Sequence, residues 1–476
     1  MLRSALLILS GNAAASLLLL ARNLVVAWLI PINDYGIAST FAIAMAVVEM
    51  ASALGLQQQI VQAKNGEDAH FQASLQGFQV LRGVVSGAVL FICAGLIADF
   101  LNVPQAAWAY RVMALVPVLN AFVHFDVHRL NRSMVFLPVI LTGAVPALLS
   151  VLAVWPLAAW YGDYKVMLYA IVVQAVATTV VSHLVARRPY RLVLDHAIMA
   201  GSLRFGWPLL VNGILMFAIF QGDKLIVGRE MGMEALAIFA MGFTLTLTPT
   251  LVMAKSAQNF FLPQLSVAEA PGMEGKNRFA HLTMVTTQTH ILFGNIMVVA
   301  VLFFGPAMAS LLLGDAYAGV TEILTPLAVM QALRLAKGGP STVALARGRT
   351  ENAMISNIVR VLSLPLAWWA AITLNSVQVI IWIAIAAELA GLGVALYLIR
   401  QTHGIRLRPL CWTLSISFAI LILAAFQPAL GQTFLDARSA FGVIIFLIIF
   451  TISFIAMVDF RAYATNLVKE KVNRQR

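Results

Sequence analysis

Long apolar runs separated by short polar segments follow one another along nearly the whole 476-residue chain. Each run approaches or exceeds the roughly 20 residues that an α-helix needs to cross the hydrocarbon core of a bilayer. The pattern predicts about fourteen transmembrane helices, at residues 5–31, 36–62, 77–99, 106–125, 134–159, 165–186, 206–229, 236–261, 281–304, 318–337, 353–374, 377–399, 409–429 and 439–459. We therefore expect an all-α polytopic membrane protein.

One basic stretch is the best candidate for a boundary between domains. Residues 187–204 follow the sixth predicted helix and begin with Arg187, Arg188, Pro189, Tyr190 and Arg191. Such a composition suits a segment that lies partly on the membrane surface. The division predicts an N-terminal six-helix bundle (residues 1–186), a cytoplasmic connector (187–204), a C-terminal six-helix bundle (205–400), and two additional transmembrane helices with a basic cytoplasmic tail (401–476).

The two predicted bundles share a weak internal repeat. When the seventh predicted helix is laid over the first, residues 24–26 (Leu-Val-Val) fall on residues 225–227 (Leu-Ile-Val), and Gln57 falls on Gln258. Six helices separate the two copies, so both copies enter the membrane from the same side and form parallel repeats, an arrangement that transporters use with a substrate site between the halves. The alternative is that hydrophobic helices resemble one another through composition alone.

Composition supports the membrane assignment, and the charge distribution orients the chain. The chain is 61% hydrophobic and 11% charged, whereas soluble domains contain about 25% charged residues. Most of the 31 basic residues fall in alternate loops, while the opposite loops hold only Lys165, Arg229 and Arg438. By the positive-inside rule this asymmetry predicts that both termini are cytoplasmic. The net charge of +11 is therefore read as a topology signal and not as a nucleic-acid-binding surface.

Several other classes of protein are disfavoured by the sequence. No glycine-rich phosphate loop, metal-spaced histidine pair or nucleotide-binding domain can be recognised, and the two cysteines, Cys93 and Cys411, lie in apolar runs. The first apolar run continues well past Ala15, which favours a transmembrane helix over a cleaved signal peptide. We expect no catalytic residues, no cofactor, no metal site and no nucleic-acid partner.

Charged residues inside the predicted helices carry the main functional signal. A charge near the bilayer centre costs roughly 2.5–3.5 kcal/mol on insertion scales, so it normally faces a partner, a watery cavity or a substrate. The bases in this position are Arg22, Arg82, Arg111, Lys224, Lys255, Arg334 and Arg360, and the acids are Glu49, Asp223, Glu322 and Glu388. The excess of bases predicts an interior suited to an anionic cargo.

Helical spacing separates the roles expected for these bases. Arg111, Lys255 and Arg334 have no acidic neighbour at helical spacing on their own helices, so we expect them to present uncompensated charge to a cavity. Arg82 and Arg360 lie nearer to helix ends, where long side chains extend toward the headgroups. Lys337 is expected to be a cytoplasmic anchor.

Two acid–base relationships involve Asp223. Lys224 adjoins Asp223, but consecutive helical residues diverge by about 100° and do not face each other. Arg22 aligns with Asp223 across the repeat, so a pair between the two halves is expected, in a coupling or an inter-half pairing role.

Polar side chains also line corresponding helices of the two halves. Asn12 and Asn23 lie on one face of the first predicted helix, and Asn212 and Asp223 repeat the same spacing on the seventh. These asparagines are candidates for the polar face of a cavity. Hydrogen bonding between helices is the equally weighted alternative.

Five segments resemble a known family. They are residues 29–36 (Leu-Ile-Pro-Ile-Asn-Asp-Tyr-Gly), 55–59 (Gly-Leu-Gln-Gln-Gln), 204–209 (Arg-Phe-Gly-Trp-Pro-Leu), 223–232 and 314–317 (Gly-Asp-Ala-Tyr). They resemble bacterial polysaccharide-transporter family proteins, among them O-antigen and exopolysaccharide repeat-unit flippases of the multidrug/oligosaccharidyl-lipid/polysaccharide exporter superfamily. Residues 236–239 (Leu-Ala-Ile-Phe) depart from the glycine and tyrosine that the family often shows there.

The resemblance implies two six-helix bundles around a central cavity and a place in the bacterial inner membrane. It also implies movement of an undecaprenyl-pyrophosphate-linked oligosaccharide repeat unit from the cytoplasmic to the periplasmic leaflet for O-antigen or exopolysaccharide biosynthesis. Combined with the charge pattern, it predicts a cationic substrate site of Arg22, Arg111, Lys224, Lys255 and Arg334. A polysaccharide polymerase and glycosyltransferases are candidate partners.

Two alternative functions stay open at this point. One is a cation-coupled multidrug exporter of the same superfamily, which should prefer acids in its cavity. The other is a non-transporting membrane scaffold for a glycan-assembly complex, which has no need for charges at membrane depth. The residues name neither the glycan nor the coupling ion, for which a proton, sodium or no ion are the alternatives.

Overall fold

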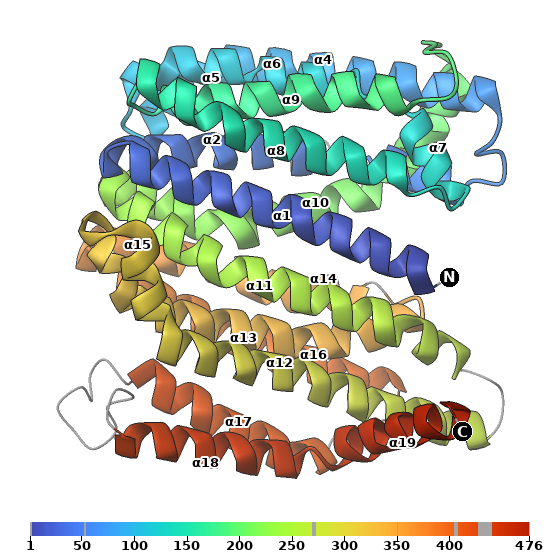
Figure 1. Ribbon diagram of the computed structural model, residues 1–476, viewed down its shortest axis with the longest axis vertical. Coiled ribbons are helices and arrows are strands. Elements are labelled where there is room, and N and C mark those ends of the chain that lie inside the picture. Colours follow the sequence, from blue (N-terminus) through green and yellow to red (C-terminus); the bar gives the residue numbers. More distant parts are fainter. Residues whose placement is uncertain are drawn as a thin grey trace. The chain divides into compact units, whose positions relative to one another are not determined.

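The structure is a computed structural model that describes residues 2–51, 54–268, 273–349, 351–403, 408–426 and 440–475. Every regular element in these ranges is a helix, which confirms the predicted all-α class. A bilayer offers no partner for backbone N–H and C=O groups, and a helix satisfies them within a single segment. The chain forms two compact units, Met1–Ala240 and Met241–Arg476, which follow each other from the blue to the red end of the colour scale in Figure 1.

The number of helices that could cross a membrane is close to the prediction but lower. Nine helices of the described residues are long and apolar enough, and the number rises to eleven if each of two bent pairs counts as one span. The bent pairs are Pro104–Ala121 with Asp126–Arg132 and Phe446–Ala456 with Val458–Asn466. Ala13–Leu29 and Trp412–Ala424 are apolar but shorter. Each predicted range overlaps a helix, although residues 427–439 lie outside the described part of the chain.

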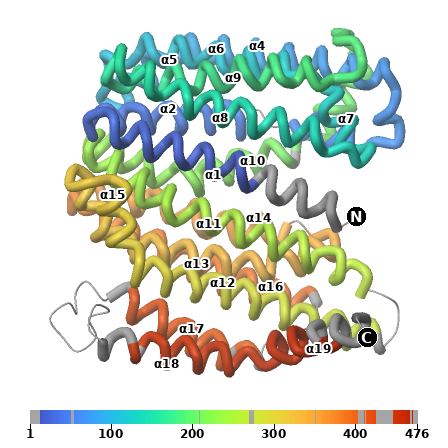
Figure 2. The backbone as a smooth tube through the Cα atoms, in the orientation of Figure 1, coloured from blue at the N-terminus to red at the C-terminus, as the bar shows by residue number. Residues whose placement is uncertain are grey.

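The first unit is built from a series of long helices and a few short ones. They are α1 (Leu2–Leu29), α2 (Ile32–Ala51), α3 (Leu56–Gln62), α4 (Ala69–Phe100), η1 (Pro104–Ala106), α5 (Ala107–Met113), α6 (Leu115–Ala121), α7 (Asp126–Arg132), α8 (Leu137–Trp160), α9 (Lys165–Val185) and α10 (His196–Glu230). Helix α1 packs on α8, α8 packs on α9, and α4 runs beside α5 and α6, as the tube in Figure 2 traces.

Helix α10 belongs to the first unit. It begins at His196, where the Asp195 side chain accepts hydrogen bonds from the backbone N–H groups of residues 197 and 198, so the helix starts well before the predicted 206. A Cβ atom at Gly213 would overlap the carbonyl oxygen of Met50, and one at Gly206 would overlap that of Leu54. These glycines let α10 approach α2 and the turn after it closely. The predicted bundle boundaries remain predictions, and packing divides the chain after Ala240.

The second unit is organised around α12. Its elements are α11 (Gly232–Val267, which begins in the first unit), α12 (Met273–Leu313), η2 (Asp315–Tyr317), α13 (Ala318–Ala346), α14 (Glu351–Val361), α15 (Leu364–Leu374), α16 (Val377–His403), α17 (Arg408–Phe426), α18 (Ala440–Ala456) and α19 (Val458–Gln475). Asn295 of α12 donates hydrogen bonds to Ser417 Oγ of α17 (2.9 Å) and Ser453 Oγ of α18 (3.0 Å). The two C-terminal helices are therefore tied to this unit by buried polar contacts.

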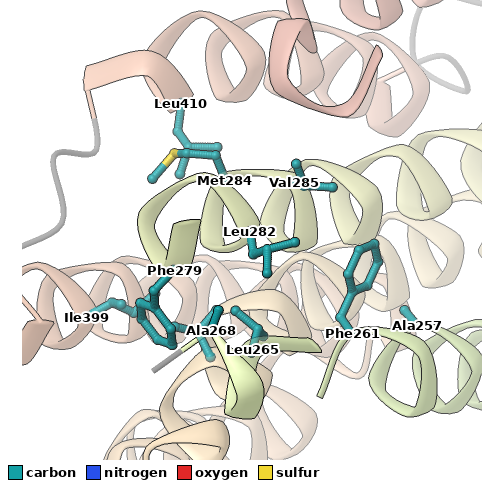
Figure 3. Close-up of a cluster of buried hydrophobic side chains, with 11 residues drawn as sticks. Ala257, Phe261, Leu265, Ala268, Phe279, Leu282, Met284, Val285, Ile399 and Leu410 are labelled. Carbon is teal, nitrogen blue, oxygen red and sulfur yellow. The ribbon is translucent and has the colours of Figure 1, made fainter. Parts of the chain in front are cut away.

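An apolar cluster holds one end of the second unit together. Figure 3 shows side chains from α11, α12, α16 and α17 meeting there, with Phe261, Leu265, Phe279 and Leu282 among them. Other large apolar side chains face outward, such as Leu311 at 85% exposure and Trp160 at 83%. Exposed apolar side chains are expected on a protein whose outer surface faces lipid instead of water.

Candidate functional site

Three helices of the second unit bring a group of charged side chains together. Helix α16 carries Glu388, which is fully buried, and it packs against both α13 and α14. Arg334 and Lys337 are three residues apart on α13, a spacing that places them on one face of the helix. Arg360, also fully buried, comes from the last turn of α14.

The Glu388 carboxylate is shared among these three bases. Its Oε1 accepts hydrogen bonds from Arg334 Nη2 (2.8 Å) and Arg334 Nε (3.0 Å), and its Oε2 accepts one from Lys337 Nζ (2.8 Å). Arg360 Nε lies 3.7 Å from Oε1. We refer to Glu388, Arg334, Lys337 and Arg360 as the Glu388 cluster.

Neutral groups complete the cluster. Gln331 Oε1 accepts a hydrogen bond from Arg334 Nη1 (3.0 Å), and Asn357 Oδ1 accepts one from Lys337 Nζ (3.0 Å). A Cβ atom at Gly391 would lie 3.0 Å from the carbonyl oxygen of Ser356, which is tighter than ordinary packing. Glycine at that position therefore allows α16 to lie close to α14 beside the cluster.

The cluster holds one negative and three positive groups at the depth of the membrane helices. Desolvation of each ion is costly, and the mutual attraction of the ions offsets that cost only where the geometry is good. One carboxylate cannot neutralise three bases, so the cluster keeps an excess of positive charge that favours a nearby anion. Within the described part of the chain, no three His, Cys, Asp or Glu side chains gather as metal ligands.

The first unit buries a base in a different setting. Arg22 of α1 is 9% exposed, and its Nη1 donates to Ser150 Oγ of α8 (3.1 Å) and Gln174 Oε1 of α9 (2.6 Å). Ser150 Oγ in turn donates to the carbonyl oxygen of Ala170 (2.8 Å). Arg22 Nε is buried without a hydrogen-bond partner among the described residues. The positive charge of Arg22 is thus held by neutral dipoles.

Several expectations about single bases need correction. Arg334 lacks an acid on its own helix, but Glu388 reaches it from α16, so it shares an acid with two other bases and is not uncompensated. Lys337 is not a cytoplasmic anchor, because its ammonium group is buried against Glu388. Arg360 does not extend toward the headgroups, because it is fully buried in the same cluster. Sequence spacing within one helix missed these pairs, since the acid lies on a different helix.

The other predicted bases of the substrate site are spread over both units. Arg111 of α5 is exposed, with its guanidinium carbon 6.0 Å from the ring centre of Phe91. Lys224 of α10 is half-buried, and Lys255 of α11 is exposed. Their roles at a substrate site remain predictions.

The predicted polar face is described in part. The side chain of Asn12 lies outside the described residues. Asn23 is half-buried on α1, Asn212 is exposed on α10, and Asp223 is buried on α10. Both Arg22 and Asp223 belong to the first unit, and their pairing remains a prediction.

Comparison with solved structures defines the class of fold. A multidrug resistance MATE family transporter of the MOP superfamily, in an inward-facing conformation, matches with a TM-score of 0.68 and 15% identity over 82% of this chain and 94% of its own. The lipid II flippase MurJ, in an inward closed conformation, matches with a TM-score of 0.68 and 14% identity over 97% of this chain and 100% of its own. The chain therefore has the fold of the MATE and MurJ membrane transporters.

The sequence comparisons identify the family. The profile of the family described as "Polysaccharide biosynthesis protein" matches residues 25–322, more than half of the chain, and the protein belongs to this family. The chain is 26% identical over 197 residues to the amylovoran biosynthesis protein AmsL of Erwinia amylovora, covering 39% of this chain and half (50%) of AmsL. It is 21% identical over 361 residues to the lipopolysaccharide biosynthesis protein WzxC of Escherichia coli, covering 72% of this chain and 69% of WzxC. These matches confirm the family resemblance noted in the sequence.

Proposed function

We propose that this protein is a flippase that moves an undecaprenyl-pyrophosphate-linked oligosaccharide repeat unit from the cytoplasmic to the periplasmic leaflet of a bacterial inner membrane. The transported unit would serve O-antigen or exopolysaccharide biosynthesis, and the protein would act by transport without catalysis. Both termini would lie in the cytoplasm, and a polysaccharide polymerase and glycosyltransferases would be its partners.

The excess of buried positive charge is the observation that carries this proposal. The Glu388 cluster has three bases for one acid, and in the described part of the chain Arg22 donates hydrogen bonds to the neutral side chains of Ser150 and Gln174. A pyrophosphate with attached sugars is too polar for the hydrocarbon core, and fixed positive charges can replace its lost hydration. AmsL and WzxC are named for polysaccharide biosynthesis and MurJ for lipid II flipping, which supports a lipid-linked glycan as the cargo.

The alternative of a cation-coupled multidrug exporter rests on the shared MATE fold. A cationic drug would be repelled by buried bases in excess over acids. This alternative predicts that deletion of the gene makes cells more sensitive to cationic drugs. The flippase proposal predicts unchanged drug sensitivity together with a loss of surface polysaccharide.

The decisive experiment compares a deletion strain complemented with the wild-type gene or with Arg22→Gln. We expect the deletion to lose surface polysaccharide and to accumulate lipid-linked repeat units in the cytoplasmic leaflet. The Arg22→Gln protein should be present at normal abundance and should restore little export. A non-transporting scaffold would instead be restored by any variant of normal abundance, and an unchanged surface polysaccharide in the deletion strain would contradict the proposal.

Asp223 is proposed to couple transport to an ion or to pair with Arg22 during the transport cycle. It is an acid buried on a membrane helix, and protonation of such a group can shift the balance between two conformations. Asp223→Asn should therefore change the dependence of export on the proton gradient. Full export with an unchanged dependence would exclude the coupling role.

A further inference from the structure

A cavity of about 220 Å³ lies in the first unit beside the segment that links α9 to α10. Its walls come from α4, from the break between α6 and α7, and from the linking segment itself. The lining residues are Ala69, Gln72, Ala73, Gln76, His124, Arg188, Pro189 and Arg191. Two arginines and a histidine are among them, and no acid is.

Hydrogen bonds hold the linking segment against the rest of the first unit, so the segment forms a stable wall of the cavity. Asp126 Oδ2 accepts hydrogen bonds from the backbone N–H groups of Arg187 (2.8 Å) and Arg188 (3.2 Å). The N–H of Val193 donates to the carbonyl oxygen of Ala73 (3.1 Å). A Cβ atom at Gly77 would overlap the carbonyl oxygen of Val193, so glycine is needed for this close approach.

His124 supplies a buried donor nitrogen with no acceptor in hydrogen-bonding geometry among the described residues, although the Arg188 backbone lies near the ring. Its side chain is 3% exposed, and its Nδ1 accepts a hydrogen bond from the N–H of Asp126 (3.1 Å). The proton of the neutral ring must then be on Nε2. Nε2 is buried and has no hydrogen-bond partner in the described part of the chain. A buried donor left without an acceptor costs free energy that a bound acceptor would recover.

The two arginines that line the cavity differ in their surroundings. Arg188 Nη1 donates to Gln72 Oε1 (3.0 Å), and Arg188 Nη2 lies 3.5 Å from the half-exposed Glu67 carboxylate. This pair fixes the position of the Arg188 fork. Arg191 is exposed on the same segment and lines the same cavity. Guanidinium groups and an imidazole N–H are the donors that bind phosphate oxygens.

We propose that this cavity binds a phosphate group, with Arg188, Arg191 and His124 Nε2 as the donors. Its volume equals that of about seven liquid waters, which is enough for a phosphate or pyrophosphate with its remaining hydration. The group would come either from a soluble phosphate compound or from the headgroup of an anionic lipid. The site shares no residue with the Glu388 cluster or with the surroundings of Arg22, and the proposal does not rest on the transported cargo.

Binding measurements on the full-length protein in detergent test the proposal with inorganic pyrophosphate as the probe. We expect Arg191→Gln to weaken binding about tenfold, as the loss of one charge-assisted hydrogen bond predicts. The matched control is Arg187→Gln, which removes the same charge from the same segment, because Arg187 is exposed but does not line the cavity. This control should change the affinity less than twofold.

A second measurement distinguishes the two sources of the phosphate. The protein is placed in nanodiscs of phosphatidylcholine alone or with phosphatidylglycerol, and pyrophosphate binding is repeated. Competition by phosphatidylglycerol that disappears in Arg191→Gln would assign the site to a lipid headgroup, and no competition would assign it to a soluble phosphate compound. Equal weakening by Arg187→Gln and Arg191→Gln, or no binding of either probe by the wild-type protein, would overturn the proposal.

Discussion

The two units bury positive charge in opposite ways. In the first unit Arg22 is surrounded by neutral hydrogen-bond acceptors, Ser150 and Gln174. In the second unit Arg334, Lys337 and Arg360 converge on the single carboxylate of Glu388. A base held by neutral dipoles attracts an anion with its full positive charge. When a base is paired with an acid, the negative charge of the acid offsets part of that attraction.

The difference separates stability from function. Loss of one member of a buried ion pair leaves the other members uncompensated, which is strongly destabilising. Loss of a lone buried base leaves only neutral groups, and it also removes the cost of placing a cation in the membrane. We therefore expect substitutions in the Glu388 cluster to lower mainly the stability of the protein. Substitution of Arg22 should lower mainly its transport activity.

The largest effect is expected for Glu388→Gln. This change leaves three bases close together without their acid, and removal of a buried partner costs roughly 3–5 kcal/mol. The protein should have low steady-state abundance and a lower thermal unfolding temperature in detergent. Both are measured on the full-length protein, the first by quantitative immunoblotting of membranes.

Glu351→Gln is the matched control for that experiment. Glu351 lies 3.8 Å from Arg349, and both side chains are about half exposed, at 53% and 51%. An exposed ion pair contributes about 0–1 kcal/mol, so this variant should behave as the wild type. Equal stability of the two variants would show that the acid in the Glu388 cluster is dispensable for folding.

Arg22→Gln should affect transport more than stability. The glutamine amide can still donate to a neutral acceptor, so the stability change should be about 1 kcal/mol or less. Export of the proposed cargo, the lipid-linked repeat unit, should fall at least about tenfold if Arg22 makes the proposed charge-assisted contact to it. Quantification of surface polysaccharide at matched protein abundance checks this. A large loss of stability with normal export per molecule would reverse the contrast between the units.

Smaller effects are expected for Arg111→Gln and Lys255→Gln. Both side chains are exposed within their own units, so neither change leaves a buried partner unsatisfied. Abundance should remain normal, and export should fall several-fold if each base adds about 1 kcal/mol to the binding of the cargo. If the two single variants and the double variant all export at the wild-type rate, Arg111 and Lys255 are not part of the cationic site.

The smallest effect on export is expected for single cysteine substitutions in the turns, which serve to test the topology by labelling. Asp34 and Asp163 lie close enough for their charges to interact, so Asp34→Cys and Asp163→Cys must be labelled from the same side of the membrane. The positive-inside pattern predicts that this side is the periplasm, and that Asp315→Cys in the second unit is labelled from there too. Labelling of Asp315→Cys from the cytoplasm alone would contradict the topology.

The class of fold could be predicted because the length and apolarity of each segment are enough to favour a membrane-spanning helix. Every predicted apolar range overlaps a helix, since each segment must satisfy its own backbone in the bilayer. The interruptions were harder to predict. Helix α7 is bent from the preceding helical segment by 50°, and α10 begins at His196, directly after Asp195, whose side chain caps it. The break before α7 falls in the mostly apolar residues 122–125 (Phe-Val-His-Phe), so apolarity alone does not mark it.

The arrangement of the site could be predicted only in part. The sequence indicates which bases lie at membrane depth, and Arg22 and Arg334 are buried or nearly so. It does not indicate which helices are neighbours. Lys337 and Arg360 meet Glu388 only because α13, α14 and α16 pack together, a contact that spacing along one helix cannot reveal.

The membership of α10 in the first unit determines where the gene can be recombined with a relative. A chimaera joined at residues 187–204 would place a foreign α10 against this chain's α2, and any side chain in place of Gly206 or Gly213 would collide with the backbone of Leu54 or Met50. A junction near Ala240 keeps both sides of that contact from one parent. Libraries of hybrid transporters, and natural exchange between related loci, should therefore yield viable products with crossovers near residue 240 more often than in the connector.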